Sequence, residues 1–529
     1  MPVRSKLRPL QSPASRIRSR PDVVEVDGVL ALAGRQETPA EARIADLLFL
    51  ADALEAADIE FLLVRDDAHT PILVVAESER LAVTRALGAA CADEPFLSIA
   101  LKRNLQPRDE PVLVADGDVA PERTDRLVSL LRPRVDPAGT LHASAASGVR
   151  FEFWVRQGAE VRVPAPNALT RRRFVAADMH VDTTERYGRT WSTIRDMFTD
   201  LASDVTFPID LVFSWVDGTD KEWQRARARR MAAYVVGEGD DAEARYRQID
   251  ELRYALRSVH TYLPWVRNIF IATDSKAPAW LADHPRVRLV RSEEFFRDTS
   301  VLPTHNSQAV EAQLHRIEGL SEHFLYSNDD MFIGRPLRPD VFFSPGGISR
   351  FIEADTRIGL GDNDSARSGF ENSARVNRVL LRERFGRVIT RHLEHAATPL
   401  TKSVVSEMEE VFADEFAATA ASPFRAKDNI SVTNSLYHYY ALLTGRAVQN
   451  TSSSVRYVDT TTHKGLAELK KLGKRRDYDF FCLNDGSFPE VAPDLRAAKV
   501  TAFLQHYFPL PAPWERAEDG IEAVPAQAG

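Results

Sequence analysis

The hydrophobic pattern changes character near the middle of the chain and predicts two α/β domains. Over residues 23–181, short apolar runs such as 61–64 alternate with an amphipathic stretch around 44–54, which predicts a small N-terminal α/β domain. Over 200–510, apolar strands alternate with helical segments whose apolar residues recur at i, i+4 and i+7. This alternation is typical of α/β domains. One hydrophobic core rarely serves more than about 300 residues, so a chain of 529 residues also needs at least two.

Apolar stripes predict two helices in the larger domain. Their stripes are Leu252, Leu256 and Val259 in the first, and Val310, Leu314 and Ile317 in the second. The second helix begins near Asn306 or Ser307, because either side chain can cap a helix start. Two polar segments, 237–241 and 359–372, predict loops. The longer loop is compatible with a mobile linker and with a lid over a substrate.

The composition gives no general electrostatic reason for contact with nucleic acid. The chain holds 68 basic and 76 acidic residues, so its formal net charge is -8. Only Cys91 and Cys482 are present, and a disulfide framework or a cysteine zinc site is therefore difficult to build. We expect a reducing compartment, the cytoplasm, and no nucleic-acid partner.

The two ends of the chain predict a basic arm and a frayed tail. Six basic residues lie within the first 22, and no apolar run follows that could form the core of a signal peptide. We expect a disordered arm over 1–22 and a tail over 511–529. No segment approaches the roughly 20 apolar residues of a membrane helix. Any membrane contact is therefore expected to be peripheral, with the arm against anionic lipid at the inner face.

Acidic residues follow three predicted strands of the larger domain. Asp217 follows the strand at 209–216, Asp274 follows 268–273, and the pair Asp329 and Asp330 comes directly after 323–327. Ligands bind beyond the carboxyl ends of strands in open α/β sheets, so these carboxylates are expected to converge on one crevice. An aspartate after a strand also commonly starts a turn, which is the favoured reading for Asp274 alone. Adjacent carboxylates repel each other, and a hard cation such as Mg²⁺ would compensate them.

Arginines and histidines supply the other candidate chemistry. The chain has no Walker-type phosphate loop and no HExxH zinc motif, so phosphate binding is left to guanidinium groups. The candidates are Arg253, Arg316 and Arg425, each of which is singly more often a surface salt-bridge partner. His392 and His395 have the spacing of a metal pair only within a helix, which the nearby proline disfavours. One histidine acting as general acid or base is the simpler reading, and a structural histidine is the alternative.

Four ordered segments of the chain resemble the conserved regions of the Stealth family of sugar-phosphate transferases. The first reads Ile-Asp-Leu-Val-Phe-Ser-Trp-Val-Asp at 209–217, and the last reads Phe-Cys-Leu-Asn-Asp at 481–485. Between them lie the second region, at 250–274 and 305–331, and the third, within 395–440. The resemblance extends over about 207–488 and says nothing about the first 200 residues.

The resemblance implies a reaction, a fold and a set of site residues. The expected reaction moves a hexose or N-acetylhexosamine 1-phosphate from a nucleotide-sugar to an acceptor glycan hydroxyl, with release of a nucleoside monophosphate. The expected catalytic domain has a Rossmann-like or GT-A-like mixed sheet and uses Mg²⁺ or Mn²⁺. The site residues that we carry over or infer are Asp217, His395 and Arg425 for catalysis, Arg253, Asn306, Ser307, Arg316 and Asn484 for substrate binding, and Asp329, Asp330 and Asp485 for the metal.

Several alternatives stay open at the level of sequence. Either His395 or Asp217 could accept the proton of the acceptor hydroxyl. Two features depart from the family pattern: the Ala-Ala-Thr after His395, and the Asn429 that stands where many relatives have aspartate. They suggest a different acceptor or sugar preference. A glycosyltransferase would use the same donor and release a nucleoside diphosphate. A protein that binds nucleotide-sugars without catalysis would keep the fold alone.

Overall fold

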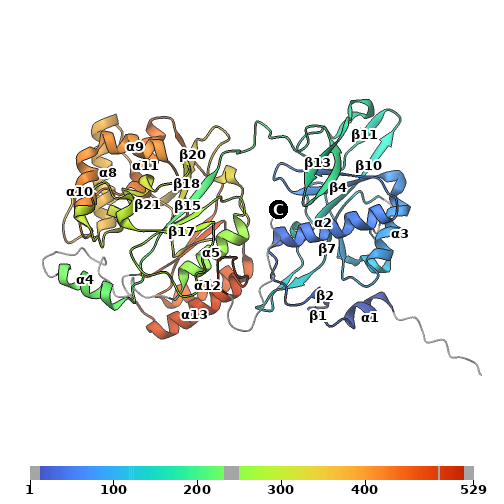
Figure 1. Cartoon of the computed structure of the whole chain (residues 1–529), viewed down its shortest axis with the longest axis horizontal. Coiled ribbons are helices and arrows are strands. Elements are labelled where there is room, and N and C mark those ends of the chain that lie inside the picture. The colour runs from blue at the N-terminus through green and yellow to red at the C-terminus, as the bar shows by residue number, and fades with distance from the viewer. Residues whose placement is uncertain are drawn as a thin grey trace, which may run out of the picture. The chain divides into compact units, whose positions relative to one another are not determined.

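The computed structural model describes residues 12–117, 119–120, 122, 124–231, 249–486 and 489–516. The predicted loop at 237–241 and most of the predicted tail lie outside the described residues. The chain divides after Asp200 into two compact units (Figure 1). Within the described part of the chain, every helix is too short or too polar to cross a membrane.

An eight-stranded sheet organises the N-terminal unit. Its strands follow the order β12-β11-β10-β7-β5-β6, and β4 pairs in parallel with β10 and antiparallel with β3. Helices α2 (Pro39–Ala56) and α3 (Arg80–Ala90) share one core with the sheet, in which Leu50 and Leu87 meet Phe151. The strands are β3 (Phe61–Arg65), β4 (Pro71–Ala76), β5 (Leu97–Ala100), β6 (Val112–Leu113), β7 (Leu127–Leu131), β10 (Val149–Gln157), β11 (Glu160–Arg162) and β12 (Arg173–Val175).

A smaller sheet and a hairpin complete this unit. The sheet has the order β1-β2-β8-β9, and the hairpin pairs β13 with β14. The hairpin carries the unit beyond the predicted limit of residue 181, because Trp191 of β14 is buried in the same core as Phe151. The strands are β1 (Val23–Val26), β2 (Val29–Leu32), β8 (Arg134–Val135), β9 (Leu141–His142), β13 (Val181–Arg186) and β14 (Arg189–Ile194).

The end of the predicted disordered arm is folded. Residues 13–18 form α1 (Pro13–Arg18), which Ser12 caps by accepting a hydrogen bond from the backbone of Ser15. Ile17 is fully buried against Leu30 and Leu32. The prediction of a disordered arm is therefore wrong for this segment, because one apolar side chain among the basic residues anchors it.

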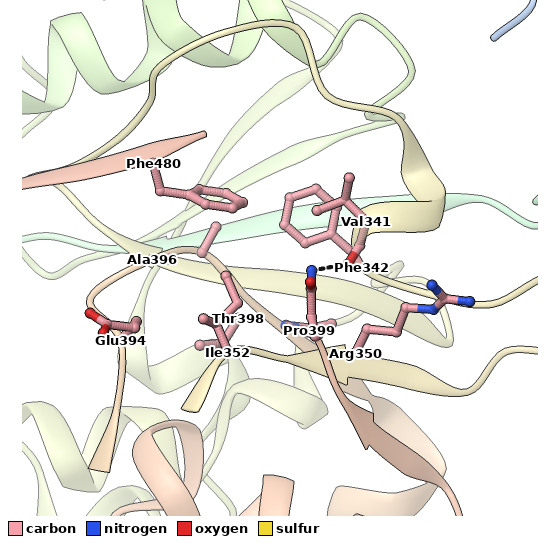
Figure 2. Close-up of a pocket in the computed structure, with 11 residues that line it drawn as sticks. Val341, Phe342, Arg350, Ile352, Glu394, Ala396, Thr398, Pro399 and Phe480 are labelled. Carbon is pink, nitrogen blue, oxygen red and sulfur yellow. Dashed lines mark hydrogen bonds between the residues drawn. The ribbon is translucent and has the colours of Figure 1, made fainter. Parts of the chain in front are cut away.

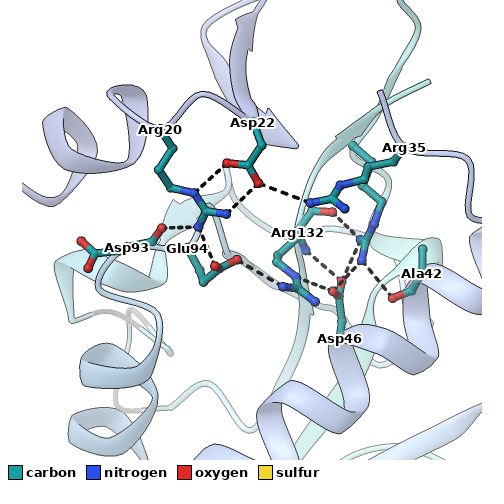
Figure 3. Close-up of polar contacts among 9 residues, drawn as sticks. Arg20, Asp22, Arg35, Ala42, Asp46, Asp93, Glu94 and Arg132 are labelled. Carbon is teal, nitrogen blue, oxygen red and sulfur yellow. Dashed lines mark hydrogen bonds and ion pairs between the residues drawn. The ribbon is translucent and has the colours of Figure 1, made fainter. Parts of the chain in front are cut away.

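Ion pairs around Asp46 tie several elements of the N-terminal unit together (Figure 3). Asp46 of α2 is 1% exposed and accepts hydrogen bonds from Arg132 Nε at 2.7 Å and from Arg134 Nη2 at 2.8 Å. Arg132 also donates to Glu94, which in turn accepts from Arg20 beside α1. One buried carboxylate thus lies at the centre of a chain of charges that joins α1, α2 and the sheet.

A five-stranded sheet forms the centre of the C-terminal unit. Its order is β17-β16-β15-β18-β23, with the first four strands parallel and β23 antiparallel to β18. Numbered along the chain, the parallel strands have the order 3-2-1-4, which is that of doubly wound nucleotide-binding sheets. The strands are β15 (Ile209–Ser214), β16 (Ile269–Ala272), β17 (Val287–Val290), β18 (His323–Asn328) and β23 (Thr398–Thr401).

Both faces of this sheet are covered, as the near-continuous apolar strands require. Phe213 of β15 belongs to one buried cluster, while Val212 on the opposite face belongs to a second. The first cluster includes α5 (Glu251–Tyr262) and α13 (Pro493–Tyr507), and the second includes α9 (Lys402–Val411). These two cores fix the parallel strands, so their carboxyl ends meet at one edge.

The two predicted helices have different outcomes. The first is confirmed as α5, whose residues Leu252, Leu256 and Val259 are buried. The second is shorter than predicted, since α7 (Ser307–Glu311) ends before a 3-10 turn at Leu314–Arg316. Asn306 is its cap and accepts a hydrogen bond from the backbone of Gln308. The predicted polar loop also ends early, because α8 (Gly369–Phe385) begins at Gly369.

A second, three-stranded sheet adjoins the first. Its order is β19-β26-β25, and only two residues separate β19 (Met331–Ile333) from the end of β18. Strands β25 (Val455–Asp459) and β26 (Phe480–Asn484) are parallel to each other. The remaining elements are α4 (Lys221–Met231), α6 (Ser292–Phe295), α10 (Ala413–Ala421), α11 (Tyr437–Leu443), α12 (His463–Arg475) and the strand pairs β20 (Ser349–Phe351) with β24 (Ala447–Gln449) and β21 (Glu353–Arg357) with β22 (Arg391–Leu393).

Replacing Asp46 by asparagine tests the buried charges of the N-terminal unit. The substitution leaves Arg132 and Arg134 without their carboxylate, so we expect a loss of about 3 kcal/mol in the free energy of unfolding. Urea unfolding followed by circular dichroism measures the change. Asp52→Asn on the same helix is the matched control, because its pair with Arg189 is exposed and worth at most about 1 kcal/mol. Equal losses of unfolding free energy in the two variants would contradict the central role of Asp46.

Candidate active site

The acidic residues predicted from strand ends lie along one edge of the five-stranded sheet. Ser214 pairs with Ala272 on one side and with Asn328 on the other. Asp217 and Asp329 therefore follow neighbouring strands at the same edge. This is the edge at which doubly wound sheets bind their ligands. The structure thus brings together positions that are more than a hundred residues apart in the sequence.

The aspartates after the first two strands have local partners. Asp217 Oδ1 accepts hydrogen bonds from the backbone and the hydroxyl of Thr219 at 2.9 and 2.7 Å, which is the geometry of a turn. Asp274 accepts from the backbone and hydroxyl of Ser292, both at 2.8 Å, at the start of α6. Asp274 thus has a structural partner, although through a contact 18 residues away and not through the turn that the sequence favours.

The carboxylates of Asp329 and Asp330 occupy the junction between the two sheets. Burial, followed by the charges of Asp330 and Glu251, raises the pKa of Asp329 well above its ordinary value. Asp330 Oδ2 accepts a hydrogen bond from the thiol of Cys482 at 3.4 Å, while no described residue donates to Oδ1. Burial also raises the pKa of Glu251 to about 7. This edge therefore gathers carboxyl groups whose charged forms the protein stabilises poorly.

His395 lies beside this acidic junction. Its Nδ1 is 3.9 Å from the sulfur of Cys482, the residue that also contacts Asp330. The ring of Tyr457 packs edge-on against the imidazole, with centroids 5.0 Å apart. Burial lowers the pKa of His395 below its ordinary value, although the charge of Asp330 opposes the shift. The imidazole is therefore neutral near pH 7 and able to accept a proton.

His392 has a different environment. It is buried on β22, and its ring stacks on Phe370 with centroids 4.6 Å apart. Burial lowers its pKa as well. The contacts of the two histidines favour the prediction of one acid–base histidine over a metal-binding pair.

Arg425 forms a second group of polar residues next to the end of β18. Its guanidinium donates to the hydroxyl of Ser307 at 2.8 Å. The hydroxyl of Tyr326 donates to Asn328 Oδ1 at 2.8 Å and lies 3.2 Å from Oε1 of Glu311, one turn along α7. Asn328 directly precedes the carboxylate pair. Arg425 and the acidic junction are thus connected by a short series of contacts through β18.

Asn306 holds the segment that carries Arg425. Its side chain is 1% exposed and donates to Asn429 Oδ1 at 2.9 Å and to the carbonyl oxygens of Ser422 and Phe424. Because protein groups take up the whole side chain, Asn306 positions Arg425 and has no surface left for a substrate. Asn429, noted as a departure from the family pattern, is the partner in this bond.

Two predicted phosphate-binding arginines are engaged elsewhere. Arg253 Nε pairs with Glu515 at 2.6 Å, and Arg257 contacts the same carboxylate. Arg316 pairs with Glu409 at 2.7 Å. Both arginines stabilise packing between elements, so the structure does not support their assignment to substrate. Their spacing in the sequence carries no sign of these partners, which come from distant segments.

Asn484 and Asp485 lie at the end of β26, where the three-stranded sheet meets this edge. The Asp485 carboxylate forms an ion pair with Arg496, and the hydroxyl of Thr460 donates to it at 3.3 Å. The carbonyl oxygen of Asn484 accepts from the same threonine. The backbone of Leu483 donates to the carbonyl of Asp330 at 2.9 Å, which fixes this strand end beside the carboxylate pair.

Sequence reasoning missed four residues of this site. They are Cys482, Tyr457, Glu251 and Arg496. Cys482 precedes Asp485 by three residues, and Glu251 precedes the stripe of α5, so both lay inside recognised segments. Tyr457 and Arg496 are carried by β25 and α13, and only the folded chain shows that they reach the site.

The donor atoms at this edge match those that a hard divalent cation prefers. Carboxylate oxygens are abundant, and Asp330 Oδ1 is a buried oxygen without a donor among the described residues. No three histidine, cysteine, aspartate or glutamate side chains of the described chain stand close enough to enclose a metal ion. A site of one or two carboxylates, completed by substrate phosphates, agrees with both observations.

All four conserved regions of the Stealth protein family match this chain in order. Conserved region 1 matches residues 207–235, region 2 matches 245–351, region 3 matches 394–442 and region 4 matches 470–522. Each of the groups described above lies within or between these regions.

Comparison with known proteins gives similar sequences and remote similar structures. The exopolysaccharide phosphotransferase CpsY of Mycobacterium leprae is 55% identical, over 96% of either chain. CpsY of Mycobacterium tuberculosis is 56% identical, over 94% of this chain and 92% of that protein. A crystal structure of the galactosyltransferase LgtC with donor and acceptor sugar analogues matches with a TM-score of 0.28 and 12% identity, over 56% of this chain and 95% of that one. That structural similarity is too low to carry a conclusion. The chain belongs to the Stealth family.

Proposed function

We propose that this protein transfers a hexose or N-acetylhexosamine 1-phosphate from a nucleotide-sugar to a hydroxyl of an acceptor glycan and releases a nucleoside monophosphate. Its relatives named exopolysaccharide phosphotransferases make it a transferase of phosphorus-containing groups. One observation carries the finer proposal: His395 and Asp330 both contact Cys482 at the edge of the sheet. Arg425 contacts Ser307 at the start of α7, near the same edge. A base, an acidic junction and a guanidinium are what phosphoryl transfer requires.

The strand order supports a nucleotide-binding architecture for the C-terminal unit. The parallel order 3-2-1-4 and the acidic edge are features of Rossmann-like and GT-A-like sheets, and we propose this class for the catalytic fold. The diphosphate of the donor then lies beyond the ends of β15 and β18. Arg425 is the described guanidinium that contacts α7 at this edge, and we assign it to the transferred phosphate.

His395 is the base in this proposal. Its Nδ1 faces Cys482, so Nε2 is the nitrogen that is left for a substrate. Nε2 takes the proton of the acceptor hydroxyl while the oxygen bonds to the β-phosphorus. The bond between that phosphorus and the bridging oxygen breaks, and the nucleoside monophosphate leaves with the bridging oxygen. Asp217 is the alternative base, but its Oδ1 is occupied by the turn at Thr219.

Asp329 and Asp330 would hold a divalent cation, Mg²⁺ or Mn²⁺. Such a cation would neutralise charge on the donor diphosphate and on the departing group. Asp485 is the third candidate ligand, although its carboxylate is already paired with Arg496. Ser307 holds Arg425, and Asn484 lies at the end of β26 close to the pair, so both are placed to contact the donor.

His395→Ala tests the proposed base. The wild type, given a panel of nucleotide-sugars, Mg²⁺ and acceptor glycans, is expected to release a nucleoside monophosphate. The variant should lose at least about 100-fold in turnover, because general base catalysis commonly contributes that much or more. Chromatography of the nucleotide products gives the rate, and circular dichroism confirms the fold. His463→Ala, at the exposed start of α12, is the matched control.

The nucleotide product also separates the rival functions. Release of a nucleoside diphosphate would establish a glycosyltransferase, and binding of the donor without any release would establish a binding protein. Near-normal turnover of the His395 variant would remove this residue from the mechanism.

Asp330→Asn tests the assignment of the cation. Removing one of two carboxylates weakens an oxygen-ligand site, so we expect half-maximal activity to need at least about tenfold more Mg²⁺. A Mg²⁺ titration of initial rates measures the shift. Asp494→Asn, on the exposed first turn of α13, is the control for a general change in charge. An unchanged titration in the Asp330 variant would refute the assignment.

A further inference from the structure

A polar pocket lies next to the segment that carries His395. It encloses about 370 Å³, within the range of roughly 300–1,000 Å³ that is typical of sites for small ligands. Its wall is formed by residues at the ends of β21, β22 and β24 and by the loop that follows β24. The polar lining residues include Glu353, Arg391, Glu394, Gln449, Asn450 and Ser453. None of the site residues predicted from the sequence belongs to it.

A narrow recess extends this pocket toward the core (Figure 2). The two spaces share Ile352, Glu394 and Asn450. The recess holds only about 10 Å³, which is space for about one water molecule, so it cannot take a sugar. Figure 2 shows Glu394 and Arg350 at opposite ends of the recess. The guanidinium of Arg350 therefore does not neutralise Glu394.

Glu394 lines this pocket with a carboxylate that has no side-chain partner, by ion pair or hydrogen bond, among the described residues. Burial and the charge of Asp355 raise its pKa above the ordinary value. The other carboxylate, Glu353, accepts from the hydroxyl of Tyr439 at 2.6 Å and lies 3.6 Å from Arg391. Asn450 is held by the carbonyl of Val341. Glu394 is thus available to a ligand hydroxyl.

Strand β25 connects the pocket with His395. Val455 lines the pocket, and Tyr457, two residues further along the same face of the strand, packs against the His395 ring. Two residues of a strand advance by about 7 Å, which is roughly the length of one sugar residue. Tyr457 as a whole residue is 44% exposed, although it is aromatic and close to the site. An exposed aromatic face beside hydroxyl-binding groups can pack against a sugar ring.

We propose that this pocket is the subsite for the acceptor and that it takes a neutral, hydroxyl-rich sugar. The proposal deepens the proposed function and rests on it. The sugar ring lies over Tyr457 and Val455, its hydroxyls bond to Glu394 and to the exposed amide of Gln449, and one hydroxyl points toward His395. The carboxylates of Glu353 and Glu394 outnumber the guanidinium of Arg391 in the lining, so the pocket disfavours an acidic sugar such as a uronate.

Saturation-transfer NMR on the full chain tests the pocket without requiring turnover. The probes are the methyl glycosides of glucose, galactose and mannose, with methyl glucuronide as the acidic counterpart. We expect at least one neutral glycoside to bind more strongly than the glucuronide. Glu394→Ala should weaken its signal at least about fivefold, and Glu394→Gln should narrow the gap between the neutral and acidic probes. Gln449→Ala, at the exposed rim, is a second variant that leaves the buried lining intact.

Glu410→Ala provides the matched control, because this exposed carboxylate lines a different pocket near the end of α9. Equal binding of neutral glycosides by the wild type and by the Glu394 and Gln449 variants would overturn the subsite. Stronger binding of the glucuronide by the wild type would overturn its neutral preference.

Kinetics separate this inference from the proposed function. The subsite predicts that Glu394→Ala raises the KM for the acceptor at least about fivefold while the KM for the nucleotide-sugar stays within twofold. An unchanged acceptor KM, in an enzyme that releases a nucleoside monophosphate, would overturn the subsite alone. Glycoside binding that depends on Glu394, in a protein that releases a nucleoside diphosphate, would support the subsite and overturn the proposed phosphotransfer.

Discussion

The placement of two adjacent, half-buried carboxylates at the junction of two sheets is the constraint on which the site depends. Asp329 and Asp330 connect β18 to β19, so each sheet has one strand that begins or ends at the pair. Backbone pairing of β18 on one side and of β19 on the other holds the two residues at this junction. Their repulsion must therefore be relieved by protons or by a cation. The fold thus holds two carboxyl groups at a place where one of them gains a proton or both share a cation.

Other groups of the site are arranged around this junction. Cys482 reaches it from β26, and through the thiol it also orients His395. Arg425 is held by Ser307, and the amide network of Asn306 fixes the segment that carries it. The acidic and basic halves of the site therefore come from different parts of the chain, and each half is held by contacts of its own.

The features that could be predicted from the sequence are those that depend on a local, periodic pattern. Apolar strands and the stripe of α5 follow directly from periodicity, and the acidic residues at strand ends follow from the parallel order. The predictions failed where one long-range contact decides the outcome. Ile17 anchors a segment whose composition favours disorder, and Glu515 and Glu409 take up Arg253 and Arg316. The sequence does not show whether an arginine near a motif is free to bind phosphate or is paired with a distant carboxylate.

The close approach of α8 to Arg425 has a consequence for variation in this chain. Gly369 opens α8, and a β-carbon at this position would lie 2.6 Å from the β-carbon of Arg425. Even alanine would thus push the arginine away from Ser307. The absence of a side chain at Gly369 therefore decides where the guanidinium of Arg425 can lie. Relatives that keep this arginine in the same pose are expected to keep the glycine as well, so the two positions should vary together or not at all.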